Sequence, residues 1–79
     1  MAPKLELYGG ASCQYTSELR ELLLWEARDF VEYDVETDIE ARRRMIDLTG
    51  GQRTIPVLVD DGRVVQIGWH GRGCMVDQP

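Results

Sequence analysis

The stretch that decides the fold is LELYGGASCQYT, residues 5–16. It opens on alternating apolar and polar residues, which predicts a β-strand over residues 4–8. A pair of glycines then breaks the strand. Apolar residues recur at helical spacing from Cys13 to about Arg28, so a helix follows directly. The stretch therefore predicts a strand, a short loop and a helix, with a cysteine where the loop meets the helix.

The segments downstream alternate in the same way. They comprise a strand over 30–35, a helix over 39–48, and two strands over 55–59 and 63–67 that an Asp-Asp-Gly turn joins. Ser12 and Asp38 are the expected N-caps of the two helices. The tail, residues 68–79, is glycine-rich, and we expect mostly loop there with at most one helical turn. The order β-α-β-α-β-β, with a right-handed crossover at its start, predicts a mixed four-stranded sheet covered by two helices in a single α/β domain over residues 1–79.

Composition and charge limit the function classes. The chain has 79 residues, 14 acidic against 9 basic side chains and a net charge of −5. This balance argues against a nucleic-acid binder, because such proteins rely on a basic face. No apolar run approaches the roughly 20 residues of a membrane span, and the N-terminus lacks the apolar core of a secretory signal. Two cysteines cannot form a disulfide-rich scaffold. We therefore expect a cytoplasmic monomer with no membrane partner.

Cys13 is the residue whose position points most clearly to chemistry. The start of a helix surrounds it with unpaired backbone amides and the positive end of the helix dipole. Both favour a thiolate, so we expect the pKa of the Cys13 thiol to be lowered and its sulfur to react at neutral pH. The Thr16 hydroxyl, three residues on, is placed to donate to that sulfur. A buried, inert cysteine is the alternative, since cysteine is often buried.

Three motifs together resemble the glutaredoxins. Residues 5–16 are similar to the opening strand and active-site turn of that family. Residues 54–56 (TIP) resemble its T-V-P element, and residues 57–65 (VLVDDGRVV) resemble its hairpin. The resemblance covers about residues 4–68 and rests on the order and spacing of the motifs. It implies a thioredoxin-like fold in which the C-terminal helix is short or missing.

The resemblance implies roles for individual residues. It makes Cys13 the nucleophile, which attacks a disulfide and passes through a mixed disulfide. It makes Pro56 a cis-proline that aims the backbone of Ile55 at an extended thiol peptide such as glutathione. A proline at the start of an edge strand is the alternative for Pro56. The remaining expected substrate contacts are Tyr15, Gln52, Arg53 and Thr54. For Arg53 a solvated loop arginine is equally acceptable.

The active-site motif departs from the dithiol form of the family. Residues 13–16 (CQYT) lack the second cysteine of C-P-Y-C, and they also differ from the C-G-F-S of iron–sulfur-carrying members. Some small glutaredoxin-like proteins are similar to this chain in carrying a second redox residue near the C-terminus. We expect the end of the last strand to lie near Cys13, so that Cys74 resolves a mixed disulfide in place of a cysteine at Thr16. A free tail thiol with no role is the alternative.

Two further features receive no chemical role. His70, Cys74 and Cys13 offer three donors, one short of a structural zinc site, so we expect no bound metal. The run Arg42-Arg43-Arg44 covers most of a helix circumference. We expect these arginines to be solvated and paired with acidic side chains of their own helix.

The sequence thus predicts a small thiol–disulfide oxidoreductase that reduces protein or glutathione mixed disulfides. Cys13 attacks, and Cys74 or glutathione resolves the intermediate. No cofactor is expected beyond glutathione as a cosubstrate, although the acidic G-G-x-D-D element with which glutaredoxins recognise it is absent. Two alternatives stay open. One is an iron–sulfur or metal carrier of the monothiol type, with Cys13 of two chains holding a cluster; the other is a redox-inactive interaction domain of the same fold.

Overall fold

The computed structural model describes residues 4–76 of the chain. Its elements in chain order are β1 (Leu5–Gly9), α1 (Gln14–Trp25), β2 (Val31–Asp34), α2 (Ile39–Leu48), β3 (Thr54–Ile55), β4 (Val57–Asp60), β5 (Arg63–Ile67) and β6 (Cys74–Met75). The expected order of strands and helices is confirmed, and a short final strand is added to it. The expected single domain over 1–79 stays a prediction, and its first and last three residues lie outside the described part.

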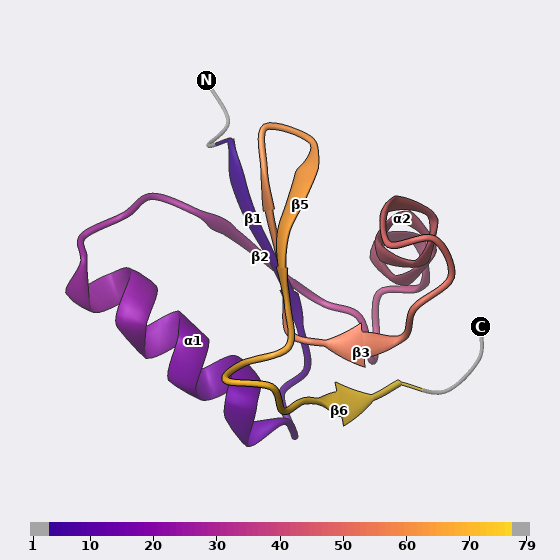
Figure 1. Ribbon diagram of the computed structural model, residues 1–79, viewed down its shortest axis with the longest axis horizontal. Helices are drawn as coiled ribbons and strands as arrows, with labels where there is room; N and C mark the ends of the chain where they lie inside the picture. Colours follow the sequence, from indigo (N-terminus) through magenta and orange to yellow (C-terminus); the bar gives the residue numbers. More distant parts are fainter. Residues whose placement is uncertain (1–3, 77–79) are drawn as a thin grey trace.

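The main sheet has four strands in the order β2-β1-β4-β5. β1 pairs parallel with β2 and antiparallel with β4, and β4 pairs antiparallel with β5. The mixed four-stranded sheet of an α/β domain is therefore confirmed. Figure 1 shows α1 on one side of this sheet and α2 on the other, while β3 and β6 lie side by side beyond its lower end.

The alternation of side chains along β1 divides the core into two layers. Leu5 and Leu7 pack with Leu19 and Leu23 of α1. Tyr8 faces the opposite side, where the larger cluster consists of Tyr8, Cys13, Val35, Ala41, Met45, Ile55, Val57, Val59 and Val76. Cys13 and Val76 therefore belong to the same apolar layer although the chain separates them widely, and this layer carries the candidate site.

The first helix is shorter than its apolar pattern suggests. It ends at Trp25, not near Arg28, because Ala27 has a φ of 55° and the Arg28 amide donates back to the Leu23 carbonyl at 3.0 Å. This left-handed ending satisfies the last carbonyls of the helix. The second helix has the expected bounds, and Asp38 caps it by accepting from the Ala41 amide at 3.0 Å.

Two expectations about polar residues are wrong. Ser12 does not cap α1: Cys13 occupies the cap position, and the Ser12 hydroxyl donates to Glu36 instead. Arg42 is not solvated but buried, and its guanidinium donates to the carbonyls of Val35 (2.7 Å) and Glu36 (3.0 Å). Arg44 lies over the rings of Tyr8 and Tyr33. Each of these side chains contacts a residue that lies close to it only in the folded chain.

The tail contains a strand where we expected loop. β6 pairs antiparallel with β3, and Pro56 separates β3 from β4 within the run 55–59. A proline has no amide hydrogen for a ladder, so it ends the pairing of β3 at that point. The last three residues of the expected tail loop lie outside the described part. Within residues 4–76, neither helix is long and apolar enough to cross a membrane.

Candidate active site

Cys13 lies at the N-terminus of α1, as the sequence predicts. It is the N-cap residue with extended backbone (φ −96°, ψ 113°), and the first turn of the helix contains no acidic residue. Its own amide donates to the Gly10 carbonyl at 3.1 Å, which folds residues 10–13 into a tight turn. The unpaired amides of the first helical turn and the helix dipole therefore meet at the cysteine.

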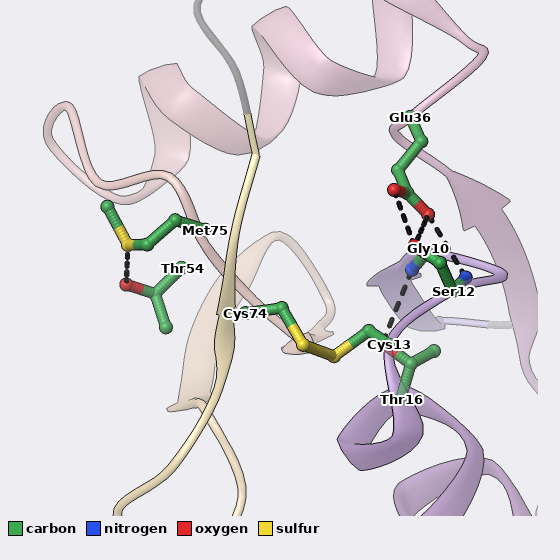
Figure 2. Close-up of a disulfide and its surroundings, with 8 residues drawn as sticks. All are labelled: Gly10, Ser12, Cys13, Thr16, Glu36, Thr54, Cys74 and Met75. Carbon is green, nitrogen blue, oxygen red and sulfur yellow. Dashed lines mark hydrogen bonds between the residues drawn. A yellow bond between two sulfur atoms is a disulfide. The ribbon is translucent and has the colours of Figure 1, made fainter.

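Cys13 forms a disulfide with Cys74 of β6. The two Cα atoms are 6.0 Å apart, which is the ordinary spacing for a disulfide. Figure 2 shows the bond joining the active-site turn to the last strand. Cys13 is only 1 % exposed in this state and Cys74 is partly buried. Cys74 thus reaches Cys13 across a sequence separation of 61 residues.

β6 is held against β3 by backbone pairing. Cys74 is opposite Ile55 and Met75 is opposite Thr54. The ladder continues one step further, because the Val76 amide donates to the Arg53 carbonyl at 2.9 Å. The Ile55–Pro56 peptide bond is cis, as the family resemblance implies. The segment before this proline therefore presents its backbone edge to the strand that carries Cys74.

Thr16 holds the turn at residues 10–13 through a hydrogen bond. Its side chain is fully buried, and its hydroxyl oxygen accepts a hydrogen bond from the Gly10 amide at 3.2 Å. A β-carbon at Gly9 would overlap the Thr16 methyl group, so the chain needs glycine there for space. Among the described residues, Thr16 makes no hydrogen bond to a cysteine sulfur. In this oxidised state it positions the turn.

Glu36 also holds this turn, through Ser12, and no local pattern in the sequence indicates this contact. Its carboxylate accepts from the Ser12 hydroxyl at 2.8 and 3.0 Å and from the Ser12 amide at 3.2 Å (Figure 2). These hydrogen bonds, above all the one from the Ser12 side chain, lower the pKa of the Glu36 carboxyl. A β-carbon at Gly10 would overlap the Glu36 carboxylate, so this position has room only for glycine. Buried Arg42 holds the backbone of residue 36 in place.

The comparison with protein families decides what kind of protein this is. The family model named Glutaredoxin matches residues 5–65, which include the Cys13 turn, the cis-proline and the hairpin. The chain belongs to the glutaredoxin family.

Two curated relatives of this glutaredoxin-family chain come from the cyanobacterium Synechocystis sp. (strain PCC 6803). The probable glutaredoxin slr1562 is 34 % identical over 59 residues, which are 73 % of this chain and 54 % of that protein. The probable glutaredoxin ssr2061 is 29 % identical over 65 residues, or 81 % of this chain and 74 % of that protein. The chain thus spans about half of the first relative.

Solved structures agree on the fold. A single-residue mutant of the thioredoxin-like protein BC3987 is 30 % identical and superimposes with a TM-score of 0.72 over 81 % of each chain. Wheat glutaredoxin gives a TM-score of 0.69 at 19 % identity, covering 84 % of this chain and 62 % of the wheat protein. A buckwheat glutaredoxin solved with glutathione gives 0.68, also at 19 %, covering 82 % of this chain and 60 % of that one. At that identity the two plant structures show the shared fold alone.

The other expected site residues of this glutaredoxin-family chain lie at different distances from the disulfide. Tyr15 is partly buried against the apolar layer that contains Cys13. The Thr54 hydroxyl donates to the sulfur of Met75 at 3.3 Å. Arg53 contributes its carbonyl to the β6 ladder, whereas Gln52 is exposed and its carbonyl accepts from the Thr49 hydroxyl at 3.0 Å. The structure thus brings Cys13, Cys74 and Ile55 together through the disulfide and the β3–β6 ladder, whereas Gln52 is exposed.

The carrier alternative needs the Cys13 sulfur of each chain as a ligand, and here the disulfide occupies that sulfur. Within residues 4–76, no three His, Cys, Asp or Glu side chains lie close enough to hold a metal ion together. His70 is exposed and packs on Trp69, with the ring centroids 4.4 Å apart. The sulfur of Cys13 is bonded to Cys74.

Replacing Glu36 is expected to weaken the fold in a pH-dependent way. Glu36→Gln removes charge-assisted hydrogen bonds to Ser12, so we expect a loss of roughly 1 kcal/mol at pH 7, kept small because the carboxylate is solvent-exposed. The folded pKa lies below the ordinary 4.5, so the stabilisation is present above pH 4.5 and is lost as the pH falls through the folded pKa. Denaturant unfolding of both proteins from pH 7 to pH 3 measures this. A difference that does not shrink below pH 4.5 would contradict the assigned role.

Proposed function

We propose that the chain is a thiol–disulfide oxidoreductase in which Cys13 is the nucleophile and Cys74 is the resolving cysteine. The observation that carries the proposal is the Cys13–Cys74 disulfide at a helix N-terminus, against the cis-proline segment. A helix start favours the thiolate form of Cys13, and the thiolate is the species that attacks. Membership of the glutaredoxin family supports the same chemistry.

The reaction runs in two exchange steps. The Cys13 thiolate attacks one sulfur of a substrate disulfide, so a Cys13–substrate bond forms and the other substrate sulfur leaves as a thiolate. The Cys74 thiolate then attacks Cys13, the substrate thiolate leaves, and the Cys13–Cys74 disulfide remains. Each departing thiolate takes a proton from water. The substrate gains two electrons and the protein loses two. Two external thiols, such as two glutathione molecules, restore them by reducing the Cys13–Cys74 disulfide and becoming a disulfide themselves.

The segment 52–56 is the proposed binding edge for the substrate. The backbone of Ile55 offers its pairing groups to an extended chain, and Thr54, Arg53 and Tyr15 lie around it. Glutathione remains the proposed reductant and an alternative resolving thiol. Thr16 acts as a positioning residue because its hydroxyl accepts from the amide of Gly10. We expect the protein to work as a monomer in a reducing compartment such as the cytoplasm, in cellular redox homeostasis.

Alkylation of each thiol as a function of pH tests the first step. In reduced Cys74→Ser, iodoacetamide capture of Cys13 is expected to report an apparent pKa below about 7.5, as for other helix-start cysteines. The matched variant Cys13→Ser leaves only Cys74, whose apparent pKa should lie near the ordinary value of about 8.5. An apparent pKa of Cys13 at or above that value would remove the activation on which the proposal rests.

A further inference from the structure

The strand β6 occupies the backbone edge that the proposed function assigns to the substrate. It runs antiparallel to β3 with Cys74 opposite Ile55, and its cysteine is bonded to the nucleophile. An extended peptide caught in a mixed disulfide with Cys13 would need the same edge and the same sulfur position. The oxidised chain therefore holds a segment of itself in the geometry of a bound substrate (Figure 2).

The side chains of this segment alternate as a bound strand requires. Cys74 and Val76 point toward the protein, and Val76 is only 6 % exposed within the apolar layer that also contains Ile55. Met75 lies on the opposite face of the strand and is 67 % exposed, where its sulfur accepts a weak hydrogen bond from the Thr54 hydroxyl at 3.3 Å. Because the period of a strand is two, the second residue after the cysteine enters the apolar layer and the first does not.

The residue before the cysteine is restricted by space. A β-carbon on Gly73 would lie 2.6 Å from the Ile55 carbonyl oxygen and 2.7 Å from the Thr54 methyl group. The carbonyl belongs to the backbone of β3 and cannot move aside without breaking the ladder. Glycine is therefore the residue that lets the strand approach β3 closely enough to pair.

We infer that β6 is an internal template of the substrate, and that the preferred substrate is a protein segment of the form Gly-Cys-x-Val. The cysteine of such a segment meets Cys13, the preceding glycine passes the Ile55 carbonyl, and the branched apolar residue fills the place of Val76. This inference rests on the proposed function and adds the substrate class to it. In glutathione only one residue, a glycine, follows the cysteine, so glutathione leaves the place of Val76 empty.

The template has a consequence for turnover. A substrate segment and β6 use the same edge of β3, so the two are mutually exclusive there. When Cys74 takes its place beside Cys13, β6 also takes the backbone hydrogen bonds of the departing substrate. Formation of the internal disulfide thus releases the reduced product from the binding edge.

Symmetric peptide disulfides test the template. The reduced Cys74→Ser protein is mixed with the disulfide dimer of blocked Arg-Gly-Cys-Met-Val, and release of peptide thiol is followed by chromatography. Attack on either sulfur forms the same Cys13–peptide bond and releases one peptide thiol. Every rate is divided by the rate of the same disulfide with 2-mercaptoethanol, which has no binding site. The tail of this variant competes equally with every peptide, so the ratios between peptides are unaffected.

Three changes to the peptide separate the contributions. Val→Ala two residues after the cysteine should slow the reaction about tenfold, through lost apolar burial. Gly→Ala before the cysteine should slow it about tenfold, through steric conflict. Met→Ala, on the outward side, should change it roughly twofold or less. Glutathione disulfide should react more slowly than the parent peptide dimer.

The same substitution in the chain gives an independent measurement. Val76→Ala should lower the equilibrium constant for the Cys13–Cys74 disulfide against glutathione about tenfold, and Met75→Ala should lower it roughly twofold or less. Normalised peptide rates that agree within twofold, or a faster reaction with glutathione disulfide, would overturn the template and leave the proposed function standing. No release of thiol from any disulfide would overturn the proposed function and the template together.

Discussion

Cys13→Ser is expected to abolish disulfide reduction, lowering the rate on the order of a thousandfold or more. A serine hydroxyl is not ionised at neutral pH, so the variant has no nucleophile at the helix start. Cys74→Ser should behave differently. Its first step is intact, and the substrate remains attached to Cys13 until an external thiol releases it. Single-turnover assays with mass spectrometry of the protein distinguish the two results.

The pair of variants forms a matched control. Neither can make the Cys13–Cys74 disulfide, so any loss of stability from the missing bond is common to both. A difference in reactivity between them therefore reports the chemical role of each sulfur. If Cys13→Ser formed the substrate adduct and Cys74→Ser did not, the nucleophile would be Cys74 and the assigned roles would be reversed.

Reduction of the disulfide is expected to lower the free energy of unfolding by about 4 kcal/mol. The bond closes a loop with a sequence separation of 61, and the chain-entropy relation for a loop of that length gives this value. For a domain of this size the loss corresponds to a decrease in Tm of about 15–30 °C. Reduction also removes the covalent attachment of β6, which is then held only by its short ladder on β3.

Thermal unfolding followed by circular dichroism, with and without reductant, measures this effect. Cys74→Ser is the control, because its Tm should match that of the reduced wild type and should not respond to reductant. If oxidised and reduced wild type melted at the same temperature, the disulfide would not stabilise the fold. By linkage, a stabilising disulfide is also one that the folded chain favours forming.

Local sequence patterns determined most of the scaffold. Alternation in residues 5–8, helical spacing after Cys13 and the Asp-Gly turn at 61–62 each act over a few neighbouring residues. The structure confirms the elements they predict. Asp38 was identifiable as a cap because its carboxylate accepts a hydrogen bond from an amide only three residues along the chain. The position of Cys13 at a helix start follows from the same local information.

The predictions that the structure corrected concern which partners polar side chains have in the folded chain. Ser12 carries the signal of an N-cap, yet its hydroxyl prefers the Glu36 carboxylate 24 residues away. Arg42 belongs to a run of three arginines that the sequence predicts to be solvated. Two carbonyls just after β2 accept hydrogen bonds from its guanidinium, which offsets the cost of burying it. In both cases the residue type allowed several partners, and tertiary packing selected one.

The sequence by itself determined the α/β fold and the position of Cys13 at a helix start, because helix and strand periodicities are local properties. The sequence made Cys74 a candidate partner of Cys13, but only the tertiary structure places the two Cα atoms 6.0 Å apart and makes the tail a strand. A two-residue strand has no periodicity to detect. Its existence depends on its pairing with β3, a segment distant in the chain that only the folded structure brings beside it. The proposed chemistry depends on both, because it needs a cysteine at a helix start and a second cysteine that the folded tail brings to it.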